Sequence, residues 1–183
     1  AELIVVACNT ASTAALKMLR EEFAHTPFVG MEPAVKPAAE QTLTGVVGVL
    51  ATYATFHNEV YNSVVERFAK DVVLLQDHCP GLVAQIEKGD LNGTDTRTIL
   101  EKALRPMLAK GIDTVVLGCT HYPFVIPLIK QIVGPDVRVI DPAPAIARQA
   151  KRLLDERGWL ANESQPGSLR LITTGDASAL SRN

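Results

Sequence analysis

The chain lacks the features that mark membrane-bound, secreted or nucleic-acid-binding proteins. No apolar run approaches the ~20 residues needed to span a bilayer, and we find no signal peptide or lipidation motif. Charged residues make up 21% of the 183 residues and the formal net charge is -2, so no basic surface predicts binding to nucleic acid. We therefore expect neither a membrane nor a nucleic acid as a partner.

Cysteine is also scarce. The three cysteines, Cys8, Cys79 and Cys119, are an odd number and cannot complete a disulfide framework. In a chain without a secretion signal this predicts a reducing, cytoplasmic location, where a cysteine is more often buried or reactive than bridged.

The sequence has no initiating Met, and residues 2–7 have the apolar pattern of a strand that is already under way. A native chain rarely opens inside a buried strand, so we expect a preceding segment to be missing.

Short apolar, β-branched runs alternate with amphipathic stretches along the whole chain. This pattern predicts an α/β fold with mainly parallel sheets that helices flank on both faces. We expect strands at residues 3–7, 28–31, 46–51, 72–76, 114–117, 137–140 and 169–173. We expect helices at residues 13–23, 35–42, 56–69, 81–88, 95–110, 127–132 and 145–157.

Two proline-bearing segments, residues 31–34 and 140–144, each stand between an expected strand and an expected helix. As hinges they divide the chain into two lobes. The first lobe comprises residues 1–33 plus 143–183, and the second comprises residues 34–142. A cleft between two such lobes is a common place for a small ligand, so we expect the active site there.

Two cysteines occupy equivalent positions in this pattern. Cys8, in the sequence CNTAS (residues 8–12), follows the first expected strand and precedes a helix. Cys119, in LGCTHYP (residues 117–123), follows another strand in the same way. A helix N-terminus stabilises a thiolate, and the strand-to-helix crevice of an open α/β sheet is where ligands bind. Either cysteine alone is more often a buried hydrophobe, but the duplication predicts two facing halves of one site.

The third cysteine, Cys79, lies between His78 and Pro80, and its context favours a structural strand-to-helix turn. His78, Cys79, Cys119 and His121 could be considered as zinc ligands. No pair of them has the usual spacing, so we expect no metal site.

CNTAS and LGCTHYP together resemble the two signature motifs of glutamate racemases. EPAVKPA (residues 32–38), the segment from residues 79 to 89 and TTGD (residues 173–176) are also similar to that family, so the resemblance covers essentially the whole chain. The family's N-terminal Asp-Ser-Gly-x-Gly-Gly and Pro-Tyr-Gly motifs, which contribute to its substrate site, are not in this sequence.

The resemblance implies a cofactor-independent enzyme that interconverts L- and D-glutamate and supplies D-glutamate for peptidoglycan in a bacterial cell. It assigns Cys8 and Cys119 to proton transfer on opposite faces of the substrate, with His121 and Glu87 assisting Cys119. Asn9, Thr10 and Thr120 are then the expected substrate-binding residues.

Three alternatives remain open. The chain could be an aspartate or hydantoin racemase of the same superfamily, although the pairing of CTHYP with CNTAS favours glutamate. It could be a truncated, inactive racemase fragment that binds a partner or associates with itself, so a homodimer is possible. It could also be a cysteine hydrolase or transferase that uses Cys119 and His121, but this would leave Cys8 unexplained.

Overall fold

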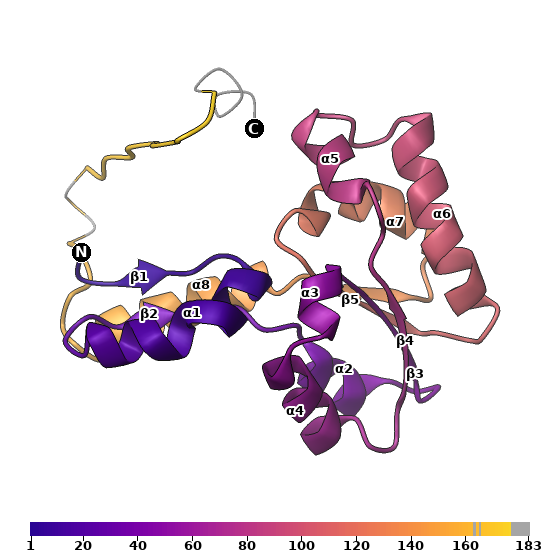
Figure 1. Cartoon of the computed structure of the whole chain (residues 1–183), viewed down its shortest axis with the longest axis horizontal. Helices are drawn as coiled ribbons and strands as arrows, with labels where there is room; N and C mark the ends of the chain where they lie inside the picture. Colours follow the sequence, from indigo (N-terminus) through magenta and orange to yellow (C-terminus); the bar gives the residue numbers. More distant parts are fainter. Residues whose placement is uncertain (163, 165, 177–183) are drawn as a thin grey trace.

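The computed structural model describes residues 1–162, 164 and 166–176 and places their strands in two parallel sheets (Figure 1). The smaller sheet pairs β1 (Ile4–Val5) with β2 (Phe28–Val29). The larger sheet has the order β4-β3-β5-β6, with bounds Val73–Asp77, Val46–Ala51, Thr114–Gly118 and Arg138–Ile140. The α/β prediction with mainly parallel sheets is confirmed.

Helices cover both faces of the larger sheet. One face packs against α5 (Leu82–Glu87), α6 (Thr94–Leu108), the 3-10 helix η1 (Tyr122–Val125) and α7 (Ile126–Val133). The other face packs against α2 (Val35–Gln41) and α4 (Glu59–Phe68). Successive residues of a strand therefore enter opposite cores, as Val115 and Val116 of β5 do.

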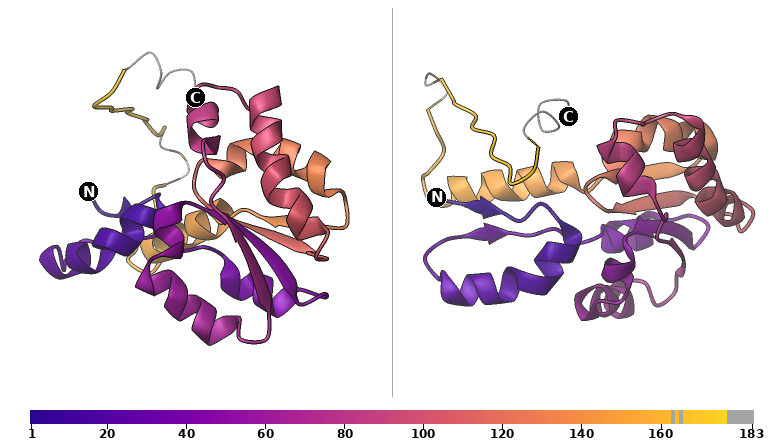
Figure 2. Two further views of the ribbon diagram at one scale, coloured as in Figure 1. Left: turned by 45° about the vertical axis from the view of Figure 1, so that its right-hand side comes forward. Right: turned by 45° about the horizontal axis from the view of Figure 1, so that its top comes forward.

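The smaller sheet lies between α1 (Asn9–Glu22) and α8 (Ala143–Asp155), which come from distant parts of the chain (Figure 2). The chain passes between the two sheets near residues 30–34 and 141–142, at the proline-bearing segments. We propose the same two lobes as the sequence predicts, a division that the separate sheets support. The parts of the first lobe at residues 163, 165 and 177–183 lie outside the described residues.

Several helix boundaries differ from the predicted ones for local reasons. α1 begins at Asn9 rather than residue 13, because Cys8 acts as its N-cap. The helix expected over residues 56–69 is interrupted between α3 (Tyr53–Phe56) and α4, where Asn58 caps the second helix by accepting a hydrogen bond from Val60 N–H.

The prediction of a strand at residues 169–173 was wrong. These residues form neither helix nor strand, and Leu169 and Ile172 are 85% and 75% exposed. The segment runs clear of both sheets (Figure 1), so it has no neighbouring strand with which to form a ladder.

None of the helices among the described residues has the length and apolar character needed to cross a bilayer.

Candidate functional site

Both cysteine motifs line one small cavity of about 150 Å³. Cys8 approaches it from the end of β1, and Cys119 from the end of β5 in the other sheet. Carboxyl ends of parallel strands are the usual place for a ligand in α/β folds. The lining residues are Cys8, Asn9, Thr10, Thr52, Val83, Gly118, Cys119, Thr120 and His121.

The structure thus brings the expected site residues together. Glu87 does not line the cavity, but its carboxylate contacts His121, which does. Thr120 is half-buried in the lining. Ligand pockets for drug-sized molecules are typically ~300–1,000 Å³, so a cavity of this size suits a small metabolite.

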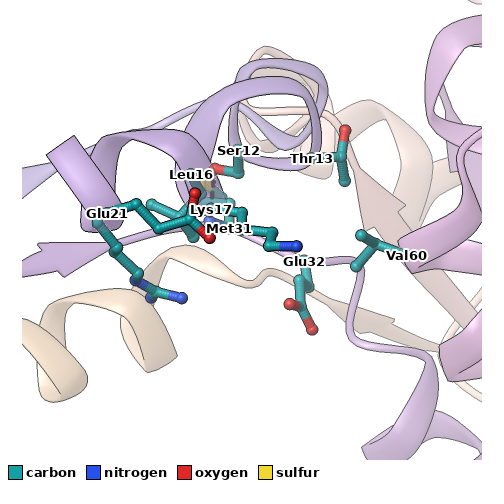
Figure 3. Close-up of a pocket in the computed structure, with 9 residues that line it drawn as sticks. Ser12, Thr13, Leu16, Lys17, Glu21, Met31, Glu32 and Val60 are labelled. Atoms are coloured by element: carbon teal, nitrogen blue, oxygen red, sulfur yellow. Dashed lines mark hydrogen bonds between the residues drawn. The ribbon is translucent and has the colours of Figure 1, made fainter.

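A larger hollow of about 340 Å³ lies beside α1, with Lys17 and Glu32 among its lining residues (Figure 3). It contains neither a cysteine nor a histidine. The Ser12 hydroxyl in its wall is already engaged, since it donates to the Val6 carbonyl and accepts from Met31 N–H. This hollow therefore offers less chemistry than the cavity between the cysteines.

Cys8 is half-buried at the start of α1. Its backbone is extended, and its Sγ accepts a hydrogen bond from Ala11 N–H at 3.5 Å. The sulfur therefore sits where the free N–H groups of the helix are directed, which favours an anionic acceptor.

Asn9 joins the two motifs directly. Its side chain is 2% exposed, and its Nδ2 donates to the Gly118 carbonyl at 2.6 Å, across 109 residues of sequence. Its Oδ1 is buried and has no hydrogen-bond partner among the described residues. A buried amide oxygen in this state is costly, and it is suited to accept a hydrogen bond from a donor on a ligand.

Two threonine hydroxyls of the lining, those of Thr10 and Thr52, belong to a chain of three hydroxyl groups. Thr10 Oγ1 lies 3.1 Å from Thr52 Oγ1, which in turn lies 3.0 Å from Thr55 Oγ1. The sequence analysis missed Thr52 and Val83 as lining residues. Thr52 could have been found, because it directly follows β3, the neighbour of the strand that ends before Cys119. Val83 gave no such signal.

Cys119 is 7% exposed, and its environment differs from that of Cys8. Burial raises the pKa of the Cys119 thiol, an effect that the backbone N–H of His121 partly offsets. The Sγ atom lies 3.8 Å from His121 Nδ1, and His121 Nε2 lies 3.1 Å from Glu87 Oε1. A carboxylate accepts from Nε2–H, so Nδ1 is left as an acceptor facing the thiol.

Gly118 is required by the close approach of β5 to β3. A Cβ at this position would lie 2.6 Å from Ala51 Cβ and 3.2 Å from the Leu50 carbonyl oxygen. The absence of a side chain lets the two strands bring Thr52 and Cys119 to the same cavity.

Cys79 lies outside the cavity, and its surroundings support a structural role. It is 2% exposed, its backbone N–H donates to Asp77 Oδ1 at 2.7 Å, and its φ is +43°. Burial and the neighbouring Asp77 carboxylate both raise the pKa of its thiol. Across the described residues, no three His, Cys, Asp or Glu side chains are grouped as metal ligands would be.

The fold and site together define an α/β protein with one thiol from each of two sheets at a shared cavity. The family model for Asp/Glu/Hydantoin racemase matches residues 1–150, and the chain therefore belongs to this family. It is 48% identical over 177 residues to a glutamate racemase of Roseiflexus sp., which covers 96% of this chain and 65% of that protein.

Solved structures of glutamate racemases are also similar. The Bacillus anthracis isoform RacE1 superposes with a TM-score of 0.81 at 31% identity, covering 99% of this chain and 68% of that one. The Escherichia coli enzyme, in complex with L-glutamate and the activator UDP-MurNAc-ala, has a TM-score of 0.75 at 39% identity, covering 84% of this chain and 58% of that one. The chain spans about two thirds of the length of the curated relatives it matches.

Proposed function

We propose that this chain carries the catalytic cysteines of a glutamate racemase, an enzyme that interconverts L- and D-glutamate without a cofactor. The observation that carries the proposal is the placement of Cys8 and Cys119, from two different sheets, in the lining of one small cavity. The similarity to glutamate racemases over nearly the whole of this chain supports glutamate as the substrate.

Inversion at the α-carbon needs a base on one face and an acid on the other. The thiolate of one cysteine removes the α-proton and becomes a thiol. The thiol of the other cysteine donates its proton to the opposite face and becomes a thiolate. The electron pair of the broken C–H bond forms the new C–H bond. The cysteine that acts as the base for one enantiomer of glutamate acts as the acid for the other.

His121 and Glu87 assist Cys119 in this proposal. The Glu87 carboxylate orients His121 through its Nε2–H, and Nδ1 then accepts the thiol proton of Cys119. This relay supplies a thiolate at a buried position, where burial alone opposes its formation.

The carbanion formed between the thiols carries charge into the α-carboxylate, which needs hydrogen-bond donors. The N–H groups at the start of α1 and the hydroxyls of Thr10, Thr52 and Thr120 surround the cavity. Each well-placed donor typically contributes ~3 kcal/mol to stabilisation of such a transition state. The unpartnered Oδ1 of Asn9 accepts from the substrate ammonium group.

Circular dichroism at a fixed wavelength, recorded over time with each enantiomer of glutamate, tests the proposal. We expect the signal of either enantiomer to decay to zero, and Cys8→Ser and Cys119→Ser each to abolish the decay. Cys79→Ser is the matched control and should retain activity, because Cys79 does not line the cavity. Full activity in either cavity variant would overturn it, whereas no decay with the folded chain would favour the truncated, inactive racemase fragment.

A substrate panel separates glutamate from aspartate and hydantoins, since only the preferred substrate should lose optical activity rapidly. A covalent adduct on Cys119 seen by mass spectrometry would point instead to a cysteine hydrolase or transferase.

We further propose that the product is D-glutamate for peptidoglycan and that the protein works in the cytoplasm. The three free cysteines support a reducing compartment. Self-association is a separate proposal, supported by the partly exposed Ile4 and Val5 of β1. A clean monomer in light scattering would contradict it.

A further inference from the structure

The outer edge of β4 is open among the described residues. β4 ends the four-stranded sheet, so its five residues pair only with β3. Natural proteins usually protect such an edge with a proline, a lysine within the strand or a bulge. β4 has the sequence VLLQD and contains neither proline nor lysine; its one charged residue is Asp77 at its end, and Val73 is 56% exposed.

A groove of about 340 Å³ runs beside this edge. One wall is formed by residues 74–77 of β4, and the other by α6 with the residue that follows its C-terminal cap. Lys102, Pro106 and Lys110 recur every fourth residue and thus share one side of the helical turns, while Ala103 and Met107 are buried beneath them.

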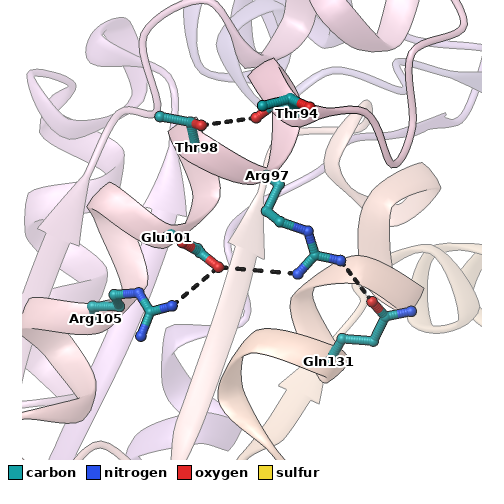
Figure 4. A network of polar contacts seen from close by, with 6 residues as sticks. All are labelled: Thr94, Arg97, Thr98, Glu101, Arg105 and Gln131. Atoms are coloured by element: carbon teal, nitrogen blue, oxygen red, sulfur yellow. Dashed lines mark hydrogen bonds and ion pairs between the residues drawn. The ribbon is translucent and has the colours of Figure 1, made fainter.

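The two lysines of this wall outnumber the one carboxylate of the lining, that of Asp77 on β4, which accepts from Cys79 N–H. Elsewhere on α6, Glu101 pairs with both Arg97 and Arg105, and Arg97 also donates to Gln131 of α7 (Figure 4). Lys102 and Lys110 are exposed and form no ion pair or hydrogen bond with the described residues.

Pro106 lies in the same wall and interrupts the hydrogen bonding of α6. Because proline has no backbone N–H, the Lys102 carbonyl lacks its usual intrahelical hydrogen bond. The groove therefore offers two ammonium groups and the unpaired main chain of β4, with the Asp77 carboxylate at the end of that strand.

We propose that an extended, acidic segment of a partner protein adds to β4 as a fifth strand. Lys102 and Lys110 are eight residues apart, ~12 Å at the helical rise, with Lys110 in the turn two residues beyond the end of α6. Side chains four residues apart on a strand lie on one face and are separated by ~13 Å. The segment thus carries acidic side chains at positions i and i+4, with an apolar side chain at i+2 over Pro106 and Met107.

A second copy of this chain fits the edge less well than an acidic segment. Pairing of β4 with β4 of another copy brings both sets of lysines together, and like charges at an interface are unfavourable. An acidic segment neutralises them and also satisfies the main chain of β4.

The test is fluorescence anisotropy with a labelled heptapeptide, acetyl-Thr-Glu-Thr-Val-Thr-Glu-Thr-amide, and the full chain. We expect saturable binding that weakens with added salt. The double variant Lys102→Glu and Lys110→Glu should lower the affinity about tenfold or more, because it replaces attraction with repulsion. The matched control, Lys130→Glu with Lys151→Glu, makes the same change in net charge on other helices and should bind as the parent chain does.

A second peptide, N-methylated at every residue, keeps the charge but has no backbone N–H to donate to β4 and should not bind. Equal binding of the two peptides, or equal binding to both double variants, would overturn strand addition at this groove. A lack of saturable binding by the first peptide would overturn it as well. So would concentration-dependent dimerisation of the chain that becomes stronger in the double variant Lys102→Glu and Lys110→Glu.

Discussion

A single buried side chain, Asn9, links the two halves of the cavity. Its Nδ2 donates to the Gly118 carbonyl, so the helix that carries Cys8 is joined to the strand that precedes Cys119. Asn9→Ala removes this bond and leaves the Gly118 carbonyl without that donor. We expect a loss of about 1–2 kcal/mol in the free energy of unfolding, measured by urea titration.

The control for this prediction is Asn62→Ala, at an exposed position of α4, which should change stability by no more than ~0.5 kcal/mol. Equal stability of Asn9→Ala and the parent chain would contradict a structural contribution from the bond.

The ionisation of Cys119 also belongs to the residue scale. Since burial raises the pKa of this thiol, its thiolate fraction should keep increasing at pH values above the ordinary thiol pKa of ~8.5. Iodoacetamide alkylation at a series of pH values, followed by peptide mapping, measures this directly. The midpoint pH for alkylation of Cys119 should be higher in the native chain than in the same chain in urea. Coincident midpoints would contradict a raised pKa in the native chain.

At the scale of elements, the contact between β3 and β5 limits what residue 118 can be. Gly118→Ala places a Cβ 2.6 Å from Ala51 Cβ, and the two strands must separate to admit it. We expect about 2 kcal/mol of destabilisation in thermal or urea unfolding. Gly167→Ala is the control, because a Cβ there meets no atom within 4 Å.

Asp113 ties the turn after α2 to the start of β5. Although burial acts in the opposite direction, hydrogen bonds from Thr44 N–H, the Thr42 hydroxyl and Leu43 N–H lower the pKa of this carboxyl from 3.8 to about 2. A depressed carboxyl pKa stabilises the fold above the unfolded value, and this contribution is lost as the pH falls from about 4 to about 2.

Asp113→Asn should therefore lower stability by about 1 kcal/mol at pH 7, a figure reduced for the solvent screening of a partly exposed group. The difference between the variant and the parent should shrink as the pH falls below about 4. Denaturant titrations at pH 7 and pH 3 measure it, and a pH-independent difference would rule out the carboxylate as the cause.

The strand ends show what the sequence could predict about elements. Cys8 and Cys119 could be placed at one site because each follows an apolar strand in a parallel pattern, and carboxyl ends of such strands gather at one edge. Thr52 was missed because one threonine after a strand carries no distinctive signal. Residues 169–173 have the composition of a strand, but composition does not supply the neighbour that a strand requires.

At the scale of the whole molecule, residues 168–173 and the central strands should differ widely in hydrogen exchange. Val47 and Leu50 are fully buried in β3, whereas Leu169 and Ile172 are largely exposed and outside any sheet. We expect amides near residues 169–172 to exchange rapidly and those of β3 to exchange with the slowest group in the chain. Mass spectrometry of peptic fragments can compare them, and strong protection near residue 170 would indicate a ladder there.

The order of the elements along the chain has a consequence for biosynthesis. The larger sheet is assembled from residues 46–140 without interruption, whereas the smaller sheet needs α8, which is the last helix among the described residues to leave the ribosome. Asn9 must wait for Gly118, 109 residues later, before its buried bond can form. Cys8 is therefore translated long before its cavity exists, so its thiol is more open to oxidants during synthesis than after folding, when it is half-buried.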